Sequence, residues 1–299
     1  MLGLTQGGRP VPSVRDRSVE AAPGTGVRND APGSGAGGEP HTGPLIRTIE
    51  SEIIPRLLLA HKGAVDARGA GVAPVEMPNG EHIAEFAGLV LTHDAAAASR
   101  YIEAMIDQGF LLETLYLHLL APAARYLGEL WSQDLCDFVD VTMALGRVQH
   151  VIREFSPAFR VAGAEPATEA RRILLAPAPG EQHSMGLMMV KEFFLRSGWD
   201  VVGGPGTPSE EVGVQVASQW FDFVGVSVGS DCRLAGLATW LAAIRGVSLN
   251  PAVKILLGGP QFVANPELAA LMGADATASD ARTAVLQAEI LAARPARPN

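Results

Sequence analysis

The residues with the clearest chemical potential in this 299-residue chain lie in a loop bounded by glycines, Gly180 to Gly186. The loop holds Glu181 and His183, and it follows an apolar run, Ile173–Pro177, that is typical of a buried parallel strand. Neutral imidazole binds transition metals, and a nearby carboxylate can hold its other ring nitrogen. Loops at the carboxyl ends of strands are where open α/β sheets bind ligands. The alternative interpretation is an ordinary solvated loop histidine.

Two more glycine-containing segments, Ser227-Val228-Gly229 and Gly258-Gly259-Pro260, also follow predicted strands. Glycine has no side chain to obstruct a ligand that enters between strands and helices. Because parallel strands with right-handed connections end at the same edge, we expect all three loops to share one rim of the sheet.

The elements that position these loops form an alternating pattern over residues 170–294. The predicted strands are Ile173–Pro177, Trp199–Val202, Phe223–Ser227, Lys254–Leu257 and Ala274–Ala278. The predicted helices are Ser184–Ser197, Ser209–Gln219, Leu234–Arg245, Asn265–Met272 and Ala281–Ala293. Strands alternating with helices indicate a doubly wound, five-stranded parallel sheet of the Rossmann-like class.

Residues 80–162 have helical periodicity throughout and predict a bundle that caps the sheet domain. The predicted helices are His82–Leu91, Ala95–Gln108, Leu111–Leu120, Pro122–Trp131 and Phe138–Phe155. Pro122 is expected to break the helix before it, and the short connections favour an antiparallel four-helix bundle. Trp131, near a helix end, is either a core residue or a flat apolar lid over a ligand.

The chain before the bundle divides into two parts. Residues 1–43 are rich in Gly, Pro and small polar residues, which predicts a disordered tail. Residues 44–62 carry an apolar stripe at helical spacing. That predicted helix either packs on the core or binds a partner.

Composition excludes several classes of protein. The net charge of −9 argues against autonomous binding to DNA, which requires basic surface. The chain has only two cysteines, Cys136 and Cys232, so a disulfide framework is not indicated. No apolar run is long enough for a membrane span and no signal peptide is recognisable, so we expect a cytoplasmic protein.

The motif Glu181-x-His183-x-x-Gly186, followed by Ser227-Val228-Gly229 and Gly258-Gly259, resembles the base-off, His-on cobalamin-binding domain. The family's pattern is D-x-H-x-x-G, then S-x-L, then G-G, so Glu181 and Gly229 depart from it; Gly229 is expected to widen the cleft for the nucleotide tail. The resemblance implies that His183 is the cobalt ligand. It implies cofactor contacts from Trp131, Glu181, His183, Ser184, Met185, Gly186, Ser227, Gly229, Gly258, Gly259, Pro260 and Thr277.

Gly128-Glu129-Leu130-Trp131 is similar to the G-x-x-W signature of the helical cap in such proteins. Methyltransferases and adenosylcobalamin photoreceptors usually carry a Glu-His pair where this chain has Val141 and Thr142. The segment Asp134–Arg147 and the helix around Ile49 instead resemble the AerR/PpaA group of photosynthesis-gene regulators.

That resemblance implies a light- or redox-responsive antirepressor, not an enzyme. It would bind hydroxo- or adenosylcobalamin and act on a CrtJ/PpsR-type repressor of photosynthesis genes, and it could form an oligomer. The alternatives are a corrinoid methyl carrier of a methyltransferase system and a haem or other tetrapyrrole sensor.

Overall fold

The computed structural model describes residues 77–163, 171–229, 234 and 236–293. These residues belong to one compact unit, Val72–Asn299. The predicted tail, the helix predicted over residues 44–62 and Cys232 lie outside the described residues. Within the described part of the chain, no helix combines the length and apolar character needed to cross a membrane.

The first part of the unit is helical, as predicted. Its elements are α3 (Gly80–Thr92), α4 (Ala95–Asp107), α5 (Leu112–Leu115), the π-helix η2 (Tyr116–Leu120), α6 (Ala121–Ser132) and α7 (Phe138–Val161). Side-chain caps fix three of the starts. Asn79 accepts from the N–H groups of Glu81 and His82, Asp94 accepts from that of Ala97, and Asp137 accepts from that of Asp140. Such caps satisfy backbone donors that the first helical turn leaves without a partner.

The helical part differs from the prediction at Pro122 and at the end of its last helix. Pro122 does not separate two helices, because α5, η2 and α6 follow one another without a gap and Pro122 takes the first turn of α6. The π-helical turn before it shifts the hydrogen-bond register where the proline lacks an N–H. The last helix was predicted to end at Phe155, but α7 continues through Pro157 to Val161.

The second part is a five-stranded parallel sheet in the order β2-β1-β3-β4-β5. The strands are β1 (Arg172–Pro177), β2 (Asp200–Gly203), β3 (Phe223–Ser227), β4 (Lys254–Gly258) and β5 (Ala276–Ala278). The helices are α8 (Met185–Arg196), α9 (Ser209–Ser218), α10 (Leu237–Val247), α11 (Pro260–Ala264), α12 (Glu267–Leu271) and α13 (Ala281–Ala293). The predicted fold class is therefore confirmed, and the short helix α11 was not predicted.

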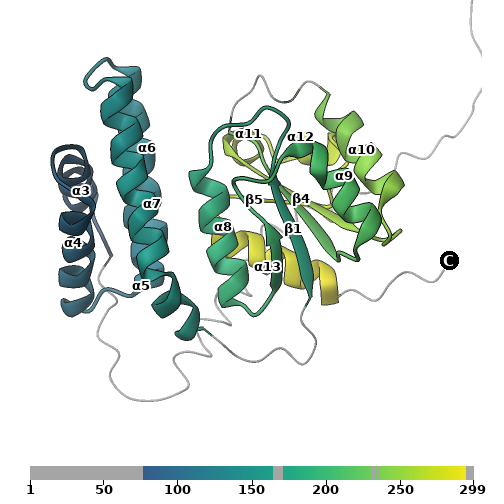
Figure 1. Cartoon of the computed structure of the whole chain (residues 1–299), viewed down its shortest axis with the longest axis horizontal. Coiled ribbons are helices and arrows are strands. Elements are labelled where there is room, and N and C mark those ends of the chain that lie inside the picture. The colour runs from purple at the N-terminus through teal and green to yellow at the C-terminus, as the bar shows by residue number, and fades with distance from the viewer. Residues whose placement is uncertain (1–76, 164–170, 230–233, 235, 294–299) are drawn as a thin grey trace, which may run out of the picture. The chain divides into compact units, whose positions relative to one another are not determined.

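The strands bury alternate residues against opposite layers of helices (Figure 1). On one face, Ile173, Leu175 and Phe223 pack in the core that contains α8 and α13. On the other face, Leu174 and Val224 pack in the core that contains α9 and α10. This period of two is the side-chain alternation of a strand covered on both faces.

Candidate cofactor-binding site

The loops after β1 and β3 meet where the strand order reverses. The chain leaves β1 toward β2 on one side and returns to β3 on the other, and the space between two such strand ends is the crevice in which open α/β sheets bind their ligands. Backbone hydrogen bonds hold the loops together: the N–H of Ala178 donates to Ser227 O, and that of Val228 donates to Gly258 O, both at 2.9 Å. The three loops predicted from the sequence therefore do lie side by side.

Glu181 organises this crevice. Its side chain is only 1% exposed. One carboxylate oxygen, Oε1, accepts from the backbone N–H groups of Gln182 and His183, each at 2.8 Å. The other, Oε2, accepts from the N–H of Gly229 at 2.5 Å and so ties the loop after β1 to the loop after β3.

His183 is held by the same carboxylate. Its Nδ1 lies 2.6 Å from Glu181 Oε1, while 71% of its side chain is exposed. A carboxylate can only accept, so Nδ1 must carry the proton. In a neutral ring with this tautomer, the lone pair of Nε2 is available. A metal ion requires such a free lone pair.

These contacts also set the ionisation of the carboxylate. Burial by itself would raise the pKa of Glu181, but hydrogen bonds from His183, Gly229 and Gln182 outweigh burial and hold the pKa below its usual value of 4.5. Glu181 is therefore ionised at neutral pH and remains able to orient His183.

Two glycines are required by the close approach of the loops. A Cβ at Gly259, where φ is +137°, would lie 1.8 Å from Val228 O, which no side chain tolerates. A Cβ at Gly229 would lie 2.8 Å from the Cβ of His183. From the sequence, Gly229 was expected to widen a cleft for a nucleotide tail; in the folded chain it makes room for the histidine.

The other predicted contacts have different surroundings. Ser184 Oγ accepts a hydrogen bond from Gln149 Nε2 of α7 at 3.2 Å. Thr277 Oγ1 donates to Leu257 O at 2.9 Å, so its hydroxyl supports the β4–β5 pair. Met185 packs partly buried against the core that α8 helps to form.

Ser227 and Gly258 lie opposite each other at the ends of β3 and β4. A Cβ added at Gly186, in the first turn of α8, or at Gly258 would meet no atom within 4 Å, and Pro260 begins α11. The loops thus bring together Glu181, His183, Ser227, Gly229, Gly258, Gly259 and Pro260.

Trp131 is not a core residue. It is 50% exposed at the end of α6, and its ring contacts that of Phe138 with centroids 6.3 Å apart. We call the exposed apolar residues at this end of the bundle the α6–α7 corner; they are Trp131, Leu135, Phe138, Val139 and Met143. Only Trp131 was identified from the sequence, although the apolar residues at exposed positions of the next helix were a signal that could have identified the rest.

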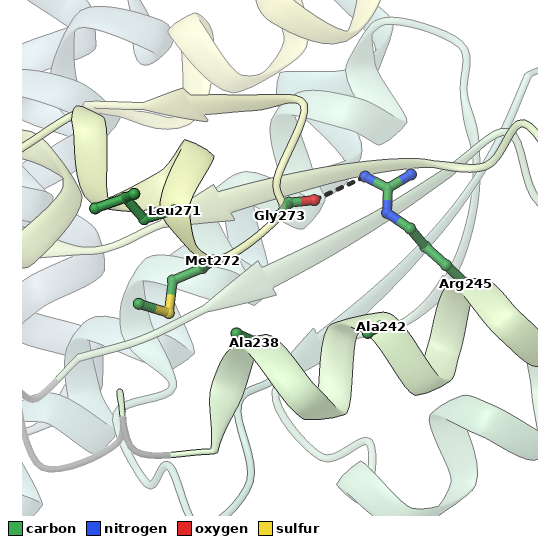
Figure 2. A pocket seen from close by; sticks show the side chains of 6 residues that line it. All are labelled: Ala238, Ala242, Arg245, Leu271, Met272 and Gly273. Atoms are coloured by element: carbon green, nitrogen blue, oxygen red, sulfur yellow. Dashed lines mark hydrogen bonds between the residues drawn. The ribbon is translucent and has the colours of Figure 1, made fainter.

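A separate pocket of about 280 Å³ lies on the sheet domain between α10 and the segment before β5 (Figure 2). It is lined by Ala238, Ala242, Arg245, Leu271, Met272 and Gly273. The Arg245 guanidinium already has hydrogen-bond partners within the protein, because it donates to Val253 O, Gly273 O and Asp275 Oδ2. None of the predicted site residues lines this pocket.

Comparison with known proteins relates the sheet domain to a B12-binding family. Residues 171–288 match the model of the B12 binding domain. A Rhodobacter capsulatus protein described as an uncharacterized 20.5 kDa protein in the bchF-crtJ intergenic region is 29% identical over 174 residues, which span 56% of this chain and 87% of that protein. The monomethylamine corrinoid protein of Methanosarcina barkeri has a similar fold, with a TM-score of 0.57 at 17% identity; the match covers 72% of this chain and 98% of that one.

Proposed function

We propose that this protein, in which residues 171–288 form a B12 binding domain, holds cobalamin through His183 and serves as a cofactor-dependent regulator without enzymatic activity of its own. The observation that carries the proposal is the Glu181–His183 pair at the reversal point of the sheet. The relative from the bchF-crtJ intergenic region and the AerR/PpaA-like motifs support a regulatory role.

The residues of the crevice fit a base-off, His-on cobalamin. Glu181 fixes the tautomer that leaves Nε2 of His183 free to bind cobalt, and the ring is exposed. A Cβ added at Gly258 would meet no atom within 4 Å, so the bare backbone at this neighbouring strand end leaves space for a ligand tail. A bound cofactor would supply a cobalt ion with an exchangeable ligand, and the protein would supply the imidazole of His183 and fix its orientation.

The α6–α7 corner is the surface that would cover the upper face of the corrin. Gln149 of α7 contacts Ser184, next to His183. The side of α7 that carries Gln149 continues toward the start of the helix through Leu145, Thr142 and Phe138, which recur at helical spacing. This row leads from the contact at Ser184 to the α6–α7 corner. Exposed aromatic rings suit a flat macrocycle better than they suit water.

Two observations favour a regulator over a methyl carrier. Val141 is 7% exposed and buried in the bundle, and Thr142 Oγ1 donates to Phe138 O at 2.7 Å. The helix thus offers neither a carboxylate nor an imidazole at the positions where the methyltransferase pattern has its Glu-His pair. A methyl-transfer assay with thiol acceptors and methyl donors separates the two functions, because only a carrier would turn over.

The test of cofactor binding is a His183→Ala variant titrated with hydroxocobalamin. Loss of a metal-ligating side chain should weaken binding about ten-fold or more and abolish the absorption change that accompanies imidazole ligation. His118→Ala, which removes an exposed histidine of η2, is the matched control and should bind like the wild type. Unchanged affinity and spectrum in His183→Ala would rule out the proposed ligand.

A further inference from the structure

Helices α7 and α8 join the bundle to the sheet domain, and their contact is strong at the carboxyl-terminal end of α7. Arg160 donates to both oxygens of Glu192, from Nε at 3.2 Å and from Nη2 at 3.0 Å. Ser156 Oγ donates to the same carboxylate at 2.5 Å, and the rings of Phe159 and Phe193 lie 5.0 Å apart. These paired hydrogen bonds to a buried carboxylate anchor this end of the contact between α7 and α8, which we call the seam.

At the other end of the seam, among the residues that the structure describes, α7 reaches the start of α8 through one side-chain hydrogen bond. Gln149 Nε2 donates to Ser184 Oγ at 3.2 Å. Gln149, Ser156 and Arg160 lie on one face of α7, because their spacing of seven and four residues returns to the same side of a helix. Gln149 is therefore the member of this polar row nearest to the candidate site.

The partner of Gln149 is the residue directly after His183. Ser184 occupies the N-cap position of α8, yet its side chain makes no capping hydrogen bond there. Within the loop, Glu181 holds the His183 ring, and Gly229 leaves space for that ring. The loop is thus fastened through Glu181 to the loop after β3 and through Ser184 to Gln149 of the bundle.

From this geometry we infer that Gln149 is a positioning residue for His183, which acts by fixing Ser184 and with it the direction of the imidazole. The inference rests on the proposed cobalamin function and deepens it, because it names the contact through which the bundle supports the cofactor loop. Gln149 itself need not touch the cofactor.

The test uses paired variants of the full-length chain titrated with hydroxocobalamin. Gln149→Leu replaces the amide donor with an apolar side chain of similar size. It should raise the dissociation constant about two- to ten-fold, which corresponds to the contribution of one ordinary hydrogen bond. Gln149→Glu should stay close to the wild type, because the Ser184 hydroxyl can turn and donate to the new carboxylate. Arg153→Leu, at an exposed position of the same helix, is the control and should have no effect.

A double-variant cycle separates positioning from direct contact. If Gln149 acts through Ser184, Ser184→Ala should weaken binding as Gln149→Leu does, and the double variant should be no weaker than either single one. Additive losses, or wild-type affinity in Gln149→Leu while His183→Ala loses binding, would overturn the inference and leave the proposed function standing.

Hydrogen exchange of the cofactor-free protein gives an independent readout. Amides at the start of α8 should exchange faster in Gln149→Leu than in the wild type, and Gln149→Glu should restore slow exchange. Equal exchange in all three proteins would contradict the inference. Failure of the wild type to bind hydroxocobalamin would instead overturn the proposed function, and the exchange measurement would still show whether Gln149 fixes the loop.

Discussion

At the scale of single residues, Glu181 does more than pair with His183. Its two oxygens accept from three backbone N–H groups, those of Gln182, His183 and Gly229, as well as from the imidazole. The sequence motif suggests only the contact to the ring. The structure shows that the same carboxylate builds the loop that presents the ring, so orientation of the ligand and stability of the loop cannot be separated.

The first residue-scale prediction concerns Glu181→Gln. An amide has a single acceptor oxygen, so its NH₂ group would face a backbone donor and one buried N–H would lose its partner. We expect a loss of about 1–3 kcal/mol in the free energy of unfolding at pH 7, measured by urea denaturation. Glu103→Gln, at an exposed position of α4, is the control and should change stability little.

The pH dependence of the same pair of proteins follows from the lowered pKa of Glu181. A carboxyl group whose pKa is lower in the folded state stabilises the fold above its unfolded pKa, near 4.5, and this contribution is lost as the pH falls through the folded value. The difference in the free energy of unfolding between wild type and Glu181→Gln should therefore be largest above about pH 5 and should decrease as the pH falls further. A difference that stays constant from pH 7 to pH 3 would contradict this account.

At the scale of elements, α7 packs in the bundle with one face and contacts α8 with another. Val148 and Ile152 are fully buried in the bundle, while Gln149, Ser156 and Arg160 contact α8. Glu192, at 7% exposure, is a rare buried charge in the sheet domain, and its pairing with Arg160 fixes how the two helices align. A buried carboxylate is costly without its partner, so this pairing favours one arrangement of the seam.

The element-scale prediction is that Arg160→Met destabilises the protein by about 1–3 kcal/mol, because the Glu192 carboxylate would keep only the Ser156 hydroxyl. Urea denaturation measures the loss. Arg153→Met, on the same helix, should cost no more than about 0.5 kcal/mol. Equal stability of the two variants would mean that solvent around the half-exposed Arg160 already screens the pair.

A second prediction at this scale concerns the α6–α7 corner. Because Trp131 is half exposed, Trp131→Ala should cost well below the roughly 3–5 kcal/mol expected for a buried tryptophan. Its melting temperature should stay near that of the wild type, while the upper ligand of bound hydroxocobalamin should exchange with added cyanide at a changed rate. A large drop in melting temperature with unchanged ligand exchange would favour a purely structural role.

At the scale of the whole molecule, charge and architecture limit how the protein can act. A net charge of −9 disfavours binding to a phosphate backbone, so we propose that the protein acts through contact with another protein. The cofactor would lie between the loops of the sheet domain and the α6–α7 corner. A change of upper ligand could then alter the surface that the bundle presents.

The corresponding prediction is that affinity for a CrtJ/PpsR-type repressor differs between the apo, hydroxocobalamin and adenosylcobalamin forms, while DNA alone is not bound at physiological salt. Binding of purified repressor to each form, measured in the dark and after illumination, checks both statements. Equal repressor affinity for all three forms would exclude the mechanism, because a ligand that does not discriminate between states cannot shift their populations.

The sequence by itself determined the alternation of strands and helices, and with it the fold class. The three central strands, β1, β3 and β4, are short apolar runs with turn residues after them, so their burial on both faces follows from local composition. It also determined the three loops and the nature of their residues, since Glu181-x-His183 and the glycines are local motifs. The helix ends near Pro122 and Pro157 were not determined, because Pro122 takes the first turn of α6 without separating it from η2 and Pro157 lies inside α7.

Only the tertiary structure decided how these pieces act on one another. The strand order, which puts β1 beside β3, depends on pairing between distant segments. The bond from Glu181 to Gly229 follows from that order, as does the reason for Gly229, whose absent side chain leaves space for His183. Gln149 carried no signal at all in the sequence, because a polar residue on an amphipathic helix normally faces solvent; the packing of α7 against α8 brings it to Ser184.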